Sequence, residues 1–290
     1  MITEAQNKII KEKTFQILET LKEKLENHYE DNLLSIFVTG STAHSDFKTN
    51  QDVDLFVVVK EDIPGEKFEH IEQELKKAWN GQLKALSPIV SHEVEDIFHS
   101  TANTFKDENL EVIVAFAAGP YFPKPIKELN IHLHSVAPIS RKFLEIWTNV
   151  FPFHALTMFH NALVLYGEDP KNIIEINADK KMLKIWLNAL KNRLEKADDE
   201  IDIRAKTLIY SKVVLQTSMT VLAYVGIYVN NSEEVARKIK EEIKINSSNL
   251  PQKALSIKRN IDDFCKNEED VKIFHQQSQD FIREIISYFE

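Results

Sequence analysis

The pattern of hydrophobic residues changes near residue 140, and this change constrains the fold more than any other feature. Before it, short apolar runs typical of β-strands lie at 33–38, 53–59, 110–117 and 131–136. After it, the spacing is helical without a convincing strand, and helices are expected at 140–165, 179–197, 204–229, 232–244 and 251–289. We therefore predict an α+β protein, with a sheet domain over residues 1–139 and an all-helical domain over 140–290.

Two helices are expected to accompany the strands. Residues 1–25 are charged and amphipathic, and they lack the apolar core of a signal peptide. Residues 66–79 carry apolar side chains at spacings of three and four. The stretch 208–229 is long enough to span a bilayer, but its several polar residues favour a buried helix of a bundle.

The composition excludes several functional classes. The 290-residue chain has a formal net charge of -9, which disfavours general binding of nucleic acids. Cys265 is the only cysteine, so neither an intrachain disulfide nor a cysteine-based zinc site can form. These features indicate a soluble protein of a reducing compartment, which we expect to be the cytoplasm, with no membrane partner. The oligomeric state is not encoded in any pattern that we recognise.

One motif in the first half carries chemistry. A strand pattern ends at Gly40 and Ser41, and about ten residues later Asp52 and Asp54 open the next strand. Alternation along a strand places both aspartates on one face, where their charges repel each other unless a cation lies between them. Carboxylate oxygens are the ligands that magnesium prefers. The alternative is a solvated hairpin with two surface aspartates.

This motif resembles the signature of the DNA polymerase beta-like nucleotidyltransferase superfamily. The likeness covers residues 35–59, including the hydrophobic run after Asp54. It implies a small mixed sheet with flanking helices, in which Gly40 and Ser41 bind a nucleoside triphosphate such as ATP. It also implies that Asp52 and Asp54 are catalytic and hold magnesium, in a site for two ions.

The superfamily usually completes its site with a third carboxylate on a later strand, and here the sequence departs from that pattern. Glu111 is one catalytic candidate. The other is the strand with Asn130, His132 and His134 on one face, where His132 stands at the expected position as a general base or a nitrogen ligand. The plainer interpretation makes both histidines hydrogen-bonded strand residues.

A further signal lies in the predicted helical domain. Lys212 is the only charged residue in the apolar stretch 208–229, and Tyr210 precedes it by two residues. The stretch is similar to a helix of antibiotic nucleotidyltransferases that reaches the nucleotide phosphates, so both residues are candidates for nucleotide binding. Alternatively, the lysine simply extends to the surface. His44, which lies in the loop between Ser41 and Asp52, is a candidate for a position that faces the substrate.

The resemblance extends to the two-domain aminoglycoside and lincosamide nucleotidyltransferases. It implies transfer of a nucleoside monophosphate to a hydroxyl of a small, antibiotic-like acceptor, with the helical domain closing the acceptor site. The negative net charge favours a cationic acceptor. Two alternatives stay open: nucleotidylation of a protein side chain, and a catalytically inactive, nucleotide-binding regulatory protein.

Overall fold

The computed structural model describes residues 3–44, 47, 50–61, 92–116, 129–135, 138–200 and 202–290. These residues form two compact units. The first comprises the described residues up to 151 together with 158–176, and the second comprises 152–157 and 177–290. The expected helix at 66–79 lies outside the described residues.

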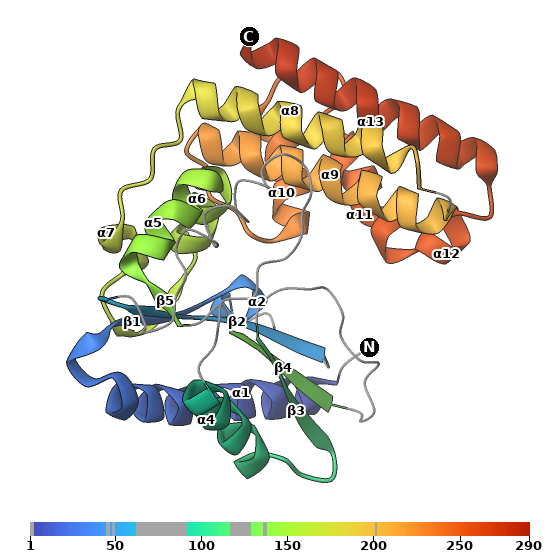
Figure 1. The fold of residues 1–290 in the computed structure, drawn as a ribbon. Coiled ribbons are helices and arrows are strands. Elements are labelled where there is room, and N and C mark those ends of the chain that lie inside the picture. The colour runs from blue at the N-terminus through green and yellow to red at the C-terminus, as the bar shows by residue number, and fades with distance from the viewer. Residues whose placement is uncertain are drawn as a thin grey trace. The chain divides into compact units, whose positions relative to one another are not determined.

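Within the described residues, six strands form one mixed sheet (Figure 1). Its order is β3-β4-β2-β1-β6, with β5 paired to β2. β2 pairs with β4, and β4 with β3, in parallel, whereas β1 is antiparallel to both of its neighbours. The strands are β1 (Leu33–Thr39), β2 (Asn50–Val59), β3 (Leu110–Phe116), β4 (Leu129–Ser135), β5 (Ile139–Ser140) and β6 (Leu163–Gly167). The predicted α+β class and the four predicted strands are confirmed.

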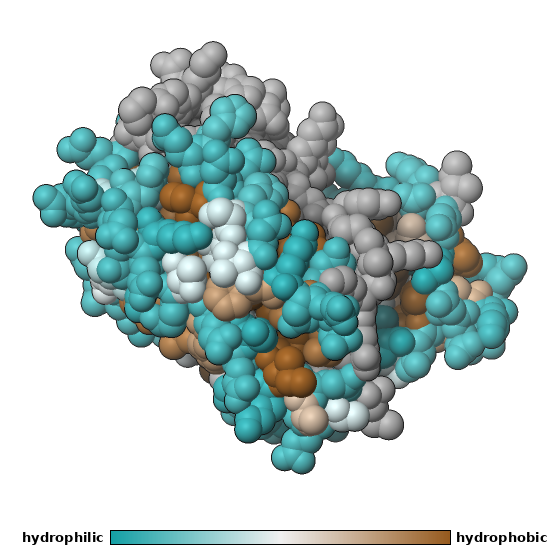
Figure 2. Space-filling view, turned by 90° about the horizontal axis from the view of Figure 1, so that it is seen from below, coloured by the Kyte–Doolittle hydropathy of each residue, from teal (hydrophilic) through white to brown (hydrophobic). Residues whose placement is uncertain are grey.

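One face of the sheet is covered by α1 (Glu4–Tyr29) and α4 (His92–Thr104) (Figure 1). Their buried side chains pack against the apolar residues of β2 and β4 that point to this face, including Val53, Leu55 and Leu133. The view from below shows a mainly hydrophilic surface with separate hydrophobic patches (Figure 2). The two helices are thus amphipathic covers of an apolar sheet face.

The opposite face changes character along β2. Phe56 stacks on Phe37, with ring centroids 4.9 Å apart, and Trp147 and Phe159 add to this aromatic group. Trp147 lies on α5 (Arg141–Val150), and Phe159 on α6 (Pro152–His160). Closer to the start of β2, the same alternation brings aspartates to this face instead of aromatic rings. One end of the face is therefore packed, and the other is polar.

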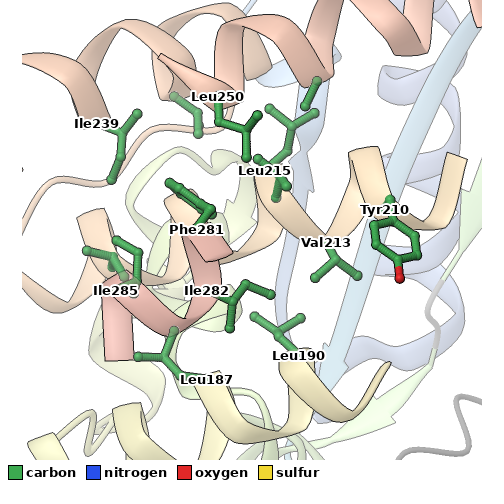
Figure 3. Close-up of a cluster of buried hydrophobic side chains, with 14 of the residues drawn as sticks. Leu187, Leu190, Tyr210, Val213, Leu215, Ile239, Leu250, Phe281, Ile282 and Ile285 are labelled. Carbon is green, nitrogen blue, oxygen red and sulfur yellow. The ribbon is translucent and has the colours of Figure 1, made fainter. Parts of the chain in front are cut away.

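The second unit is helical and has its own hydrophobic core (Figure 3). α9 (Ile203–Tyr224) is its central helix, and most of its side chains are buried, as predicted for this stretch. Asp or Asn side chains cap several of the helices, which fixes where they begin. The other helices are α8 (Lys180–Ala197), α10 (Ser232–Glu242), α11 (Leu250–Arg259), α12 (Ile261–Phe264) and α13 (Glu268–Phe289).

Two expectations about the second half were wrong. The single helix expected over 140–165 is replaced by α5 and α6, and residues 163–167 form β6, because they pair with β1 and complete the sheet. In the two compact units, residues 158–176 belong to the first and 152–157 to the second, and the predicted domains at 1–139 and 140–290 stay a prediction. The single helix expected over 251–289 is broken at Asn260, whose backbone is not helical, and Asn267 then caps α13. The short helix α7 (Pro170–Ile173) follows β6.

No helix in the described part of the chain combines the length and the apolar character that crossing a bilayer requires.

Candidate active site

The turn between β1 and β2 is built around Gly40, which begins the one-turn helix α2 (Gly40–Ala43). Its φ of +68° lies in the left-handed region that side chains disfavour. A Cβ atom at this position would also lie 2.8 Å from Oδ2 of Asp54, closer than such contacts allow. Glycine is therefore needed both for the backbone turn and for the approach of the aspartate.

Gln51 ties this turn to the strand that carries the aspartates. Its buried Nε2 lies 3.0 Å from Oγ of Ser41, 2.7 Å from Oγ1 of Thr42 and 2.9 Å from the backbone oxygen of Asp52. Thr42 in turn donates its hydroxyl to the Asp52 backbone oxygen at 3.0 Å. These bonds fix the position of Ser41 relative to Asp52. They run through the buried side chains of Gln51 and Thr42, whose hydrogen bonds are shielded from water.

Asp52 and Asp54 project from β2 beside His134 of the parallel strand β4. The register pairs Asp54 with His134, and Asp52 with His132. Nδ1 of His134 lies 3.3 Å from Oδ1 of Asp52 and 3.6 Å from Oδ1 of Asp54. One donor atom from each of the three residues fits within 4.8 Å of the others. Two carboxylates and an imidazole at this spacing fit a divalent cation.

The electrostatics of the three side chains reflect their crowding. Burial, together with the charge of Asp54, raises the pKa of Asp52 to about 6, although His134 opposes this shift. Burial would lower the pKa of His134, but a hydrogen bond with Asp54 and the charges of both aspartates outweigh it and raise that pKa. Two adjacent carboxylates thus lack sufficient positive charge, as expected where a cation binds.

The two predicted candidates for the third position lie on the same face of the sheet: His132 on β4 is paired with Asp52, and Glu111 lies one strand further from β2, on β3. His132 is 5% exposed, and burial and His134 lower its pKa while Glu111 opposes that shift. Glu111 on β3 pairs with Asn130 on β4, and its Oε2 is buried with no hydrogen-bond partner among the described residues. The sheet therefore places His132 next to Asp52, and Asn130 and Glu111 further along the same face, whereas His134 is the residue that contacts both aspartates.

The other candidates have different environments. Tyr210 is fully buried in the helical unit, where its hydroxyl donates to Oδ1 of Asp198 at 2.6 Å. Lys212 is exposed on α9, and His44 is exposed at the end of α2. Tyr210 and Lys212 belong to the second unit, so their predicted part in nucleotide binding stays a prediction.

A model of the nucleotidyltransferase domain family matches residues 16–121, which include Gly40, Ser41, Asp52, Asp54 and Glu111. This chain carries a nucleotidyltransferase domain. The match confirms the predicted resemblance and the predicted class of enzyme, a transferase of nucleotidyl groups. The match ends before β4, so His132 and His134 lie outside the matched residues.

The chain is also similar to a solved structure of spectinomycin adenyltransferase AAD(9) from Enterococcus faecialis with ATP and spectinomycin. The identity is 12%, the TM-score is 0.46, and the alignment covers 93% of this chain and 99% of that one. No curated protein matches the chain. A likeness this distant identifies no substrate.

Two residues of the nucleotidyltransferase domain were underrated by sequence reasoning. His134 was placed on the correct face but not chosen as the contact of the aspartates, because alternation alone does not give the register between two strands. Gln51 was missed entirely. A polar residue directly before Asp52, in a strand that is otherwise apolar, was the available signal.

Proposed function

We propose that the protein transfers a nucleoside monophosphate from a nucleoside triphosphate, in a magnesium-dependent reaction, to a hydroxyl of a small, antibiotic-like acceptor. The observation that carries this proposal is the packing of the Gly40 turn against Asp54. Gly40, which has no side chain, lies directly beside the carboxylate of Asp54, and Gln51 holds Ser41 in the same turn. Phosphate oxygens and a bound cation need these two features next to each other.

In the proposed reaction the acceptor oxygen forms a bond to the α-phosphorus, and the bond to pyrophosphate breaks. Pyrophosphate leaves with the electron pair of that bond. Asp52 and Asp54 would hold the magnesium, which when bound neutralises charge on the phosphates and lowers the pKa of the acceptor hydroxyl. The backbone of Gly40 and the hydroxyl of Ser41 would orient the triphosphate. His132 or Glu111 would accept the acceptor's proton.

The acceptor is proposed to be a small cationic molecule, since the net charge of -9 favours the approach of cations. The decisive test is pyrophosphate release from each of the four common triphosphates, with and without magnesium, in a screen of hydroxyl-bearing aminoglycoside-type compounds. If the triphosphate is radiolabelled on its nucleoside monophosphate part, transfer of the label to a protein instead would favour nucleotidylation of side chains. Magnesium-dependent triphosphate binding without any pyrophosphate release would favour the inactive, regulatory alternative.

A pair of variants tests the proposed base. If His132 accepts the proton, His132→Gln should remove a rise in rate with pH, while Glu111→Gln should leave that rise in place. If Glu111 acts instead, Glu111→Gln should abolish most transfer, and His132→Gln should change little. Wild-type rates and pH profiles in both variants would exclude both residues.

A further inference from the structure

The third side chain at the aspartate pair is an imidazole, whereas the proposed function assumes an ion that prefers oxygen ligands. Nδ1 of His134 lies 3.3 Å and 3.6 Å from one carboxylate oxygen of each aspartate. In an octahedral shell with ligand bonds of about 2.1 Å, neighbouring ligands are about 3.0 Å apart. The distances from Nδ1 to the two carboxylate oxygens are therefore close to the edge length of such a shell, and the donors of all three residues lie within 4.8 Å of one another.

The backbone holds His134 in this position from both sides. Its strand, β4, lies between β2 and β3 in the sheet and pairs with both. The side chain is only 22% exposed, while those of Asp52 and Asp54 are 47% and 41% exposed. The imidazole thus lies on a strand that is held from both sides. The two carboxylates are the more solvent-exposed members of the three.

The ligand set has consequences for the choice of ion. Two aspartates and a neutral imidazole supply two negative charges, one fewer than three carboxylates would. Magnesium depends on charged oxygen ligands and gains little from a nitrogen, whereas first-row transition ions bind mixed nitrogen and oxygen sites more tightly. Replacing a carboxylate by a histidine should therefore weaken magnesium binding more than manganese binding.

We propose that His134 is the third ligand of the catalytic ion and that the site selects a divalent transition ion, represented by Mn²⁺, over Mg²⁺. This inference rests on the proposed function for its assumption that an ion binds at Asp52 and Asp54, and it corrects which ion that is. The competing arrangement is a protonated His134 that replaces the ion as an internal cation.

The test is a titration of the metal-free, full-length protein with Mn²⁺. Binding is measured by the loss of the free-ion signal in electron paramagnetic resonance. We expect one tight class of sites, with a Kd at least tenfold lower for Mn²⁺ than for Mg²⁺ in competition. Pulsed measurements should detect a ¹⁴N nucleus coupled to the bound Mn²⁺. The coupling should vanish in His134→Gln and persist in His99→Gln, which alters an exposed histidine of α4.

The variant His134→Asp restores an all-oxygen site and should reduce the preference for Mn²⁺ at least tenfold. Bound Mn²⁺ without nitrogen coupling in the wild type, or equal Kd values for the two ions, would overturn the proposal. Failure of both ions to bind would also overturn it, in favour of the internal cation. Because these readouts need only the wild-type protein, they hold even if His134→Asp does not fold.

Pyrophosphate release separates this inference from the proposed function. If the protein turns over with Mg²⁺ and its bound Mn²⁺ shows no nitrogen coupling, His134 is not a ligand but the proposed function still holds. Nitrogen-coupled Mn²⁺ in a protein that releases no pyrophosphate with either ion supports the site and removes the function.

Discussion

The two units of the molecule each contain a cluster of carboxylate and histidine side chains, and the clusters are opposites. In the helical unit, Asp198 accepts from Tyr210 at 2.6 Å and from Gln279 at 3.2 Å, and Lys206 lies 2.9 Å away. Burial works against ionisation there, but these partners outweigh it and lower the pKa of Asp198. The charge of Asp198 is satisfied from within the protein.

In the sheet unit the balance is reversed. Asp52 has a second carboxylate beside it, and its pKa is raised to about 6 by burial and by Asp54. His134 is its one cationic neighbour among the contacts described for this residue. Similar side chains thus suit packing where the protein matches their charges, and suit the binding of a ligand where a charge is left unmatched.

The largest expected difference between the clusters concerns their carboxylates. Asp52→Asn should reduce transfer about 10³-fold, equivalent to about 4 kcal/mol of transition-state stabilisation, and should leave the melting temperature unchanged or higher. Asp198→Asn should leave transfer intact and lower the free energy of unfolding by about 1 kcal/mol, since it weakens hydrogen bonds to a charged group. Pyrophosphate release and calorimetry measure the two effects. Full activity of Asp52→Asn would remove the catalytic assignment.

A glycine in each unit sharpens the comparison next. Gly40 and Gly226 both have positive φ, +68° and +84°, but a Cβ at Gly226 would meet no atom within 4 Å. Alanine at either position should destabilise the fold by about 1–2 kcal/mol through backbone strain. Only Gly40→Ala should also weaken triphosphate binding, by about 100-fold, because its methyl group displaces Asp54. Equal affinities of the two variants in calorimetric titrations would refute the assignment of the Gly40 turn.

Two glutamines, the buried Gln51 and the half-buried Gln279, are expected to differ by a smaller amount. Gln51→Leu removes the donor to Ser41 and Thr42, and should weaken triphosphate binding about tenfold, or about 1.4 kcal/mol. Gln279→Leu removes donors to Asp198 and Tyr210 and should affect only stability. If Gln51→Leu bound the triphosphate as tightly as Gln279→Leu does, Gln51 would have no positioning role.

The last comparison concerns a dependence of stability on pH in the helical unit. Burial, with Lys206 nearby, lowers the pKa of His275 to about 4, although Asp198 opposes this shift. The unfolded chain therefore takes up a proton on His275 below about pH 6.5 while the folded chain does not. Stability should be complete above that pH and fall, by at most about 1.4 kcal/mol per pH unit, as the pH decreases towards 4.

Urea unfolding between pH 4 and pH 7 measures this slope. His275→Phe preserves a ring that stacks on Tyr210, whose centroid is 4.1 Å away, and should flatten the acid side of the curve. Identical slopes for the variant and the wild type would mean that other groups titrate in this range.

Local patterns were sufficient to predict much of the fold and part of the site. The valine-rich run after Asp54 predicts β2, and Gly40 and Ser41 mark the end of β1 without any knowledge of the partners. The part proposed for His132 stays a prediction. The contact of His134 with the aspartates was missed, because it depends on the register of β4 against β2, which are distant in the sequence. β6 failed for a related reason: five residues hold too short a pattern to distinguish strand from helix until pairing with β1 decides.

The pairing of β1 with β6 bears on how the protein is made. Ser35 hydrogen-bonds through its hydroxyl to the backbone oxygens of Tyr166 and Glu168, so the partner of this edge is synthesised more than a hundred residues after it. On the ribosome, this edge of β1 stays unpaired while the intervening chain is synthesised, and unpaired strand edges can pair with other chains. A nascent chain of this protein should therefore depend on chaperones most during the interval between the synthesis of Thr39 and that of Leu163.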